Sequence, residues 1–280
     1  MLGRMDGLTC FDVTTLGKVA HVRLNRPDEL NTMIPAFWSE LPEVVTALSD
    51  SGAVRAIVIS STGKHFSAGM DLSVFGSINL EGEPGRRNAT FSMLVKRLQD
   101  SFTALERARV PVLAAIQGGC IGGSVDMVCA ADMRYATADA YFVVQETNIG
   151  MTADVGTLQR LPKLIPDGIA RELVYTGRRM GAQRAAEVGL VNQVFADHES
   201  MVAGVLEIAQ EIASKSPLAI WGAKQALVYA RDHGVPDSLE QISLWQTGAF
   251  QPVDMMESFA AKTEKRDPDY EDLPTAPEGV

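Results

Sequence analysis

The stretch that most constrains the fold is VRAIVISSTG, residues 54–63, where a continuous β-branched run ends at a glycine. A strand that reads as continuously apolar is typical of a sheet with both faces covered by helices. Further strand patterns occur in 112–118 and 133–146. The chain is therefore predicted to be an α/β protein.

A theme of two strands followed by a helix recurs over the first two thirds of the chain, and the last third reads as helical. No Pro/Gly-rich linker separates the two parts, so we predict a core over residues 1–200 and a C-terminal helical region and tail over 201–280. The predicted strands are two within 11–27, one each in 54–63 and 112–118, two in 133–146 and one near 195; the predicted helices are 36–50, 91–108, 124–132, 155–165, 168–177 and one near 184, with a long loop over 64–88.

Charge and cysteine content exclude several classes of partner. The formal net charge of −10 over 280 residues repels nucleic-acid phosphates and anionic lipid. Cys10, Cys120 and Cys129 are widely spaced and form no metal-ligand pattern, which fits a reducing compartment. With no long apolar run and no signal-peptide pattern, we expect a cytoplasmic protein that uses no membrane or nucleic-acid partner.

The segment HFSAGMDL, residues 65–72, follows the buried strand and contains a small Ala-Gly pair. Small residues let a ligand approach the main chain closely. The amide of Ala68 is therefore a candidate hydrogen-bond donor to a carbonyl oxygen. An ordinary tight turn is the alternative.

The segment GGCIGGSVDMV, residues 118–128, joins glycines to a helix start. Such a start presents free amides and the positive end of the helix dipole, which together hold an anion or an enolate oxygen. The amide of Gly123 is the candidate donor. Asp126 lies in the first turn, where a catalytic role and simple stabilisation by the dipole are both open.

Glu146 and Asp154 are eight residues apart in an apolar, small-residue stretch, at an expected strand end and before an expected helix. Asp154 has an alternative role as the N-cap of that helix. Carboxylates that share an apolar pocket raise each other's pKa and become usable proton carriers. Ser67 and Ser124 have no evident His partner, so a nucleophilic hydrolase is not supported.

Four motifs in order resemble the enoyl-CoA hydratase/isomerase (crotonase) superfamily: VRLNRPDELN, GKHFSAGMDL, GGCIGGSVDMVCAADMRYATADAYF and GTLQRLPKLI. The resemblance covers residues 11–273. It implies a crotonase-like spiral of ββα repeats, with a C-terminal helical trimerisation region that often pairs trimers into hexamers.

Two further segments, 150–163 and 227–246, are similar to the dienoyl-CoA isomerase branch of this superfamily. The resemblance implies an enzyme of fatty acid β-oxidation that converts a 3,5-dienoyl-CoA to the 2,4-isomer through a dienolate. It implies oxyanion-hole amides from Ala68 and Gly123 and catalytic carboxylates from Asp126, Glu146 and Asp154. An acid at position 154 distinguishes this branch from the hydratases, which usually have a small residue there.

The same resemblance implies an acyl-CoA substrate, with coenzyme A as part of that substrate, and no metal or other cofactor. The expected substrate-contacting residues are Phe66, Ser67, Ala68, Gly69, Met70, Gly122 and Gly123. Most of the twelve methionines are expected to pack in the core, and some of Met70, Met127 and Met151 are candidates for a flexible acyl site. The alternatives within the superfamily are a 2-enoyl-CoA hydratase and a Δ3-Δ2-enoyl-CoA isomerase. Asp126 is one methylene shorter than the hydratase glutamate, which argues against strong hydratase activity.

Basic residues near the C-terminus, Lys262, Lys265 and Arg266, are either contacts for the CoA phosphates or a solvated charge run. A non-catalytic acyl-CoA-binding or RNA-binding member of the superfamily is a rival interpretation. RNA binding requires basic faces, whereas this chain is acidic overall. A silent acyl-CoA binder has no need of three acids near the ligand.

Overall fold

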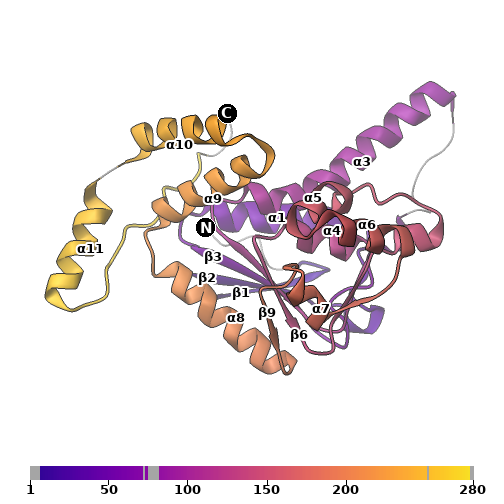
Figure 1. Cartoon of the computed structure of the whole chain (residues 1–280), viewed down its shortest axis with the longest axis horizontal. Helices are drawn as coiled ribbons and strands as arrows, with labels where there is room; N and C mark the ends of the chain where they lie inside the picture. Colours follow the sequence, from indigo (N-terminus) through magenta and orange to yellow (C-terminus); the bar gives the residue numbers. More distant parts are fainter. Residues whose placement is uncertain (1–6, 72, 75–81, 251, 278–280) are drawn as a thin grey trace.

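The computed structural model describes residues 7–71, 73–74, 82–250 and 252–277, which form the α/β architecture predicted from the sequence (Figure 1). Its larger sheet is parallel except for the antiparallel pair at one edge. In spatial order its strands are β1 (Phe11–Leu16), β2 (Val19–Leu24), β3 (Ala56–Ser61), β4 (Val112–Ile116), β6 (Met133–Thr137) and β9 (Gln193–Phe195).

A smaller sheet contains β5 (Gly119–Ile121), β7 (Tyr141–Val143) and β8 (Met180–Gly181). Strand β5 pairs with β7 in parallel and β7 with β8 antiparallel. The sequence predicted β7 but neither of its partners. β5 carries a glycine and β8 has two residues, so neither has the apolar alternation that marks a strand, and tertiary pairing forms them instead.

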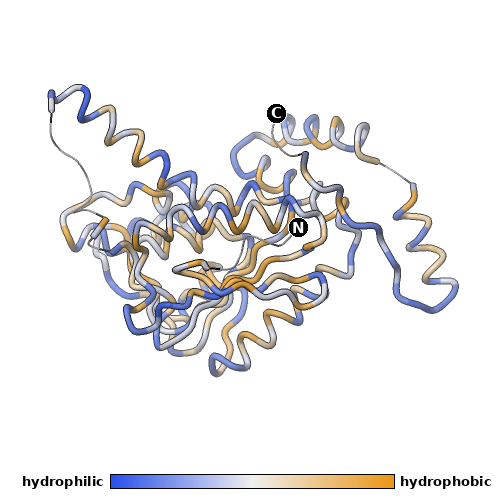
Figure 2. The backbone as a smooth tube through the Cα atoms, turned by 180° about the vertical axis from the view of Figure 1, so that it is seen from behind, coloured by the Kyte–Doolittle hydropathy of each residue, from blue (hydrophilic) through white to orange (hydrophobic). Residues whose placement is uncertain are grey.

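Strand β3 is buried on both faces, as its continuous apolar sequence predicted. Its alternate residues enter two separate clusters: Ile57 and Ile59 face one, and Ala56 and Val58 face the other. Helix α8 (His198–Ala213) covers the second face. Figure 2 shows the hydrophobic strands of the sheet in the interior of the molecule.

The opposite face of the large sheet carries the main core, which draws on the helices before α8. Trp38 and Phe102 pack with ring centroids 5.2 Å apart, and Phe37 lies edge-on to Trp38 at 5.7 Å. These helices are α1 (Phe37–Asp50), α3 (Pro84–Arg107), α4 (Gly123–Ala130), α5 (Thr157–Leu164), α6 (Asp167–Thr176) and α7 (Ala182–Glu187).

Helix α3 begins seven residues before its predicted start at 91, inside the stretch that was expected to be a loop. The side chain of Glu83 caps it by accepting hydrogen bonds from the amides of Gly85 at 2.9 Å and Arg86 at 3.0 Å. Pro84 occupies the first turn, where its missing N–H costs nothing. The N-terminal part of α3 projects from the body of the molecule (Figure 1).

The last helices extend away from the sheet: α9 (Pro217–Asp232), α10 (Val235–Ala249) and α11 (Pro252–Glu264) (Figure 1). Lys224 ties α9 to the core, because its Nζ contacts Asp132 at 2.8 Å and donates to the carbonyl of Leu105 at 2.7 Å. Helix α8 spans the predicted boundary at residue 200 and packs on the sheet. In the part of the chain that the structure describes, no helix has the length and apolarity to cross a bilayer.

We predict that Phe102→Ala lowers the free energy of unfolding by about 3–5 kcal/mol, because Phe102 is fully buried against Trp38. Met93→Ala on the same helix is the control, since Met93 is 64% exposed, and should change it by less than about 0.5 kcal/mol. Chemical unfolding measures both; equal losses would contradict the packing described here.

Candidate active site

Four chain segments converge on a cavity of about 310 Å³. It contains all three predicted carboxylates and both predicted oxyanion-hole residues. The lining comprises Ala68, Met70, Val74, Phe91, Leu94, Val95, Leu98, Gly122, Gly123, Asp126, Gln145, Glu146, Ile149, Met151, Asp154 and Val155.

The two glycine-containing motifs cross at the polar end of this cavity. The amide of Ser67 donates to the carbonyl of Gly119, and the amide of Ile121 donates to the carbonyl of Ser67, both at 3.2 Å. Gly69 has φ +86°, and a Cβ there would lie 2.5 Å from the carbonyl oxygen of Ile121 and 3.2 Å from the amide nitrogen of Gly123. The crossing therefore requires glycine at position 69.

The two candidate oxyanion donors differ in their present hydrogen bonding. Gly123 begins α4, and no acceptor among the described residues is bonded to its amide. The amide of Ala68 donates to the carbonyl of Leu30 at 3.0 Å. A substrate oxygen that reaches both amides must therefore share the Ala68 amide with Leu30 or displace it.

Not all of the expected substrate-contacting side chains reach the cavity. Phe66 and Ser67 are fully buried behind its wall. The Ser67 hydroxyl donates to the carbonyl of Asn31 at 2.8 Å and accepts from the amide of Gly69 at 3.1 Å. The serine thus braces the turn that presents Ala68, and Phe66 fills the core.

Asp126 lies in the first turn of α4, as predicted, and is 1% exposed. Its Oδ1 accepts a hydrogen bond from the amide of Thr157 at 2.6 Å, so it caps the start of α5 from a different helix. Burial raises the pKa of Asp126 to about 7, with a further contribution from the charge of Glu146. Asp126 therefore caps helix α5 and is also one of the three carboxylates that line the cavity.

The alternative in which Asp154 caps α5 is wrong. The N-cap residue of α5 is Gly156, which has no side chain to accept hydrogen bonds from the amides of the first turn. Asp154 is half-buried, and burial raises its pKa. Asp154 lines the cavity, and its carboxylate is not engaged in capping α5.

Glu146 does not end a strand as expected: β7 ends at Val143, and Glu146 begins the 3₁₀ helix η2 (Glu146–Ile149). Burial, followed by the charge of Asp154, raises its pKa. Its Oε2 is buried and has no hydrogen-bond partner among the described residues. A Cβ on Gly122 would lie 3.2 Å from Oε1, so a glycine there leaves space beside the carboxylate.

An apolar wall of the cavity was not foreseen from the sequence. Helix α3 supplies Phe91, Leu94, Val95 and Leu98. Met70 and Met151 line the cavity as expected, whereas Met127 is buried in the core. The periodicity of α3 could have identified an apolar face, but not the cavity that this face borders.

The predicted basic group near the C-terminus is partly engaged elsewhere. Arg266 pairs with Glu257, at 3.0 Å in one of the two contacts, and with Glu264 at 2.6 Å. This favours the surface-charge interpretation for Arg266.

This fold and cavity belong to a recognised class. The family model for enoyl-CoA hydratase/isomerase matches residues 14–273. The chain belongs to that family.

Individual relatives agree with this assignment. The chain is 44% identical to the mitochondrial Δ3,5-Δ2,4-dienoyl-CoA isomerase of Rattus norvegicus, over 92% of this chain and 80% of the relative. It is 37% identical to the peroxisomal Δ3,5-Δ2,4-dienoyl-CoA isomerase of Arabidopsis thaliana, over 92% and 95%. The crystal structure of an enoyl-CoA hydratase from Bacillus anthracis superposes with a TM-score of 0.84 at 32% identity, covering 93% of this chain and 98% of that one.

We predict a pH-dependent stability difference between the wild type and Asp126→Asn. The ordinary carboxyl pKa of 3.8 applies to the unfolded chain and a pKa of about 7 to the folded one. At this group the folded state therefore binds more protons in this range, and the contribution of Asp126 to the free energy of unfolding falls as pH rises from 3.8 to 7. Each pKa unit of difference contributes about 1.4 kcal/mol.

Asparagine cannot ionise but keeps an acceptor for the Thr157 amide. The wild-type value minus the variant value should fall steadily across this interval, as measured by denaturant unfolding at a series of pH values. A difference independent of pH would show that Asp126 does not titrate in this way.

Proposed function

We propose that this protein isomerises a 3,5-dienoyl-CoA to the 2,4-dienoyl-CoA in fatty acid β-oxidation. The observation that carries the proposal is the presence of Glu146, Asp154 and Asp126 in one cavity with the Gly123 amide. The 44% identity to a relative named for this reaction supports it. A hydratase needs no third acid at position 154.

In this mechanism the amides of Ala68 and Gly123 donate hydrogen bonds to the thioester oxygen of the substrate. Removal of a proton from carbon 2 yields a dienolate whose negative charge collects on this oxygen. Preorganised main-chain donors stabilise such charge by roughly 3–4 kcal/mol each in comparable sites. The crossing of the two glycine-containing motifs fixes both peptide units in place; the Gly123 amide has no acceptor among the described residues, whereas the Ala68 amide must share or give up its bond to Leu30.

Two carboxylates are needed because the proton leaves carbon 2 and returns at carbon 6. These carbons are four bonds apart, which exceeds the reach of one fixed side chain. We assign the removal of the proton from carbon 2 to Glu146 and the protonation of carbon 6 to Asp154. The same reaction results if the two residues exchange these roles. The raised pKa of each acid suits proton transfer near neutral pH.

Asp126 is assigned a tuning role. With a pKa of about 7, it is partly protonated at neutral pH, which reduces repulsion between the carboxylates. Its hydrogen bond to the Thr157 amide also fixes the start of α5, next to Asp154.

In this mechanism the acyl chain lies against the apolar residues that α3 contributes to the cavity. Coenzyme A enters as part of the substrate, and the chemistry requires no metal or redox group. The relatives in rat and Arabidopsis are named mitochondrial and peroxisomal, so a cytoplasmic location stays a prediction for this chain.

A homotrimer or a dimer of trimers is also proposed. Its support is the exposed apolar surface of α10 and α11, which extend away from the core (Figure 1). The large exposed side chains on these helices and between them include Leu239, Leu244, Phe250, Val253, Met255, Met256 and Phe259. Burial of such a surface drives association.

Asp154→Asn should lower kcat for dienoyl-CoA isomerisation by at least about 10²-fold, because one proton transfer then has no carboxylate. Substrate affinity should change by less than about threefold, since the amides that hold the thioester remain. The gain of conjugation with the thioester gives an absorbance change that measures the reaction. Direct titration with a non-reacting acyl-CoA measures the affinity.

Hydration of crotonyl-CoA by the wild type is the control that separates the rival activity. Efficient hydration without dienoyl isomerisation would reject the proposal in favour of a 2-enoyl-CoA hydratase. Unchanged isomerisation by Asp154→Asn would remove Asp154 from the mechanism.

The association proposal predicts a solution mass of three or six times the 30.2 kDa monomer. The double substitution Leu244→Glu and Phe259→Glu should yield monomers, because it places charge on exposed apolar positions of α10 and α11. Leu16→Glu, at an exposed position of β1, should leave the mass unchanged. Light scattering after size-exclusion chromatography measures all three; a monomeric wild type would contradict the proposal.

A further inference from the structure

The main chain of residues 154–157 is held from outside at three successive points. The side-chain amide of Gln99 donates to the carbonyl of Asp154 at 2.7 Å. The guanidinium of Arg160 donates to the carbonyl of Val155 at 3.4 Å. Asp126 accepts from the amide of Thr157 at 2.6 Å.

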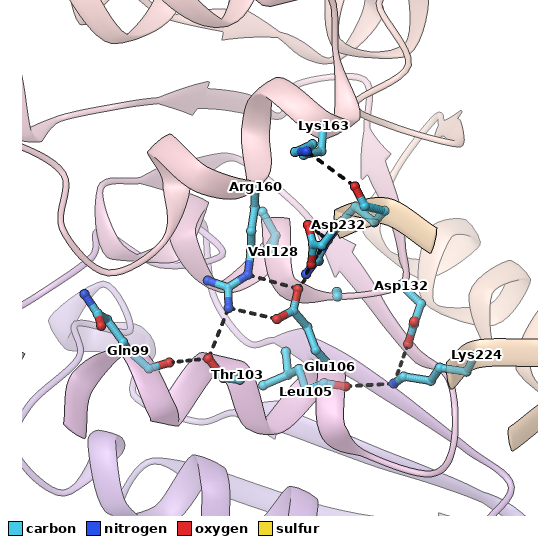
Figure 3. Close-up of polar contacts among 12 residues, drawn as sticks. Gln99, Thr103, Leu105, Glu106, Val128, Asp132, Arg160, Lys163, Lys224 and Asp232 are labelled. Carbon is cyan, nitrogen blue, oxygen red and sulfur yellow. Dashed lines mark hydrogen bonds and ion pairs between the residues drawn. The ribbon is translucent and has the colours of Figure 1, made fainter. Parts of the chain in front are cut away.

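Arg160 is itself fixed by a nearly buried ion pair with Glu106 on α3. Its Nε and Nη2 donate to the two carboxylate oxygens at 3.1 and 2.9 Å, and the side chains are only 11% and 10% exposed (Figure 3). A two-pronged contact of this kind fixes the orientation of the guanidinium as well as its position. Arg160 therefore presents its remaining donors in one direction.

Thr103 links the Arg160 guanidinium to the main chain of α3. Its Oγ1 accepts from Arg160 Nη2 at 3.1 Å and donates to the main-chain carbonyl of Gln99 at 2.9 Å (Figure 3). Gln99, Thr103 and Glu106 all lie on α3, so this helix carries both Gln99 and the carboxylate that fixes Arg160, whereas Asp126 belongs to α4.

Gly156 permits the guanidinium to lie against the main chain. Its φ is +137°, and a Cβ there would lie 1.9 Å from Nη1 of Arg160. Any other residue at this position would have to displace the arginine. The close contact is thus a property of the sequence Gly156–Arg160 and not of the arginine alone.

The carboxylate of Asp154 has no comparable support of its own. The hydrogen bonds of the described residues include none from another side chain to it, so its direction depends on its main chain. We propose that Gln99 and the Arg160–Glu106 pair are positioning residues that set the place of the Asp154 carboxylate in the cavity. This inference rests on the role of Asp154 proposed above.

Such positioning matters because proton transfer requires donor and acceptor at hydrogen-bond distance, and a displacement of 1 Å can cost about 10²-fold in rate. Helix α3 also supplies Val95 and Leu98 to the apolar wall of the cavity. One rigid element therefore sets the distance between the bound acyl chain and the acid that is to act on it.

Gln99→Leu tests the inference, because leucine has a similar volume but no donor and the ion pair stays in place. We expect kcat to fall by about tenfold or more while KM stays within about twofold. In heavy water, deuterium incorporation at carbons 2 and 6 reports the two proton transfers separately. Gln99→Leu should slow the same transfer as Asp154→Asn and leave the one slowed by Glu146→Gln unchanged.

Arg160→Lys keeps a charge opposite Glu106 but loses the planar fork, and it should produce the same selective loss. Arg231→Gln is the matched control. Arg231 on α9 pairs with the same Glu106 carboxylate, yet it donates to no atom of residues 154–157. This variant should keep the wild-type kcat even if its unfolding temperature falls.

If Gln99→Leu slows both transfers equally or neither, or if Arg231→Gln loses as much activity as Arg160→Lys, the support is merely structural and the inference fails. If Arg160→Lys keeps the wild-type kcat, the Arg160–Glu106 ion pair has no positioning role and only Gln99 remains in the inference. Unchanged transfers in Asp154→Asn would instead remove Asp154 from the proposed mechanism, and crotonyl-CoA hydration without isomerisation by the wild type would reject the proposed function, so the failures are distinguishable.

Discussion

The main-chain crossing of residues 66–69 with β5 is the constraint on which the candidate site depends. Hydrogen bonds between Ser67, Gly119 and Ile121 bring the segment that follows β3 against β5, which follows β4. The approach is so close that Gly69 cannot carry a side chain. It places two peptide units with catalytic potential beside each other, and the Ser67 and Ser124 hydroxyls add hydrogen bonds to the same main-chain segments.

The acids around this crossing are costly to bury, and their arrangement reflects that cost. Burial is the largest cause of the raised pKa of Asp126, Glu146 and Asp154. Asp126 recovers part of the cost through the Thr157 amide, whereas Glu146 keeps a buried oxygen without a partner. An unsatisfied buried acceptor is expensive in a folded protein, so its presence in a cavity is consistent with a ligand that completes it.

Much of the fold was predictable because local patterns and tertiary environment agree. The apolar run of β3 required cover on both faces, and α8 and α1 provide it. The predictions failed where long-range contacts override local signals. β5 and β8 are strands only because β7 lies between them, and α3 starts early because Glu83 caps a segment that reads as a loop.

The sequence by itself determined the α/β class, the glycine positions and the identity of the three acids, because periodicity, small residues and charge are local properties. The tertiary structure alone decided that Asp126 caps a helix other than its own, that α3 walls the cavity, and that Gln99 and Arg160 support residues 154–156. The Asp126–Thr157 and Gln99–Asp154 contacts join residues 31 and 55 positions apart in the chain, and Arg160, although close in sequence to Val155, is held in place by Glu106, 54 positions away. No local pattern encodes such a distance, since it is closed only when the helices pack on the sheet.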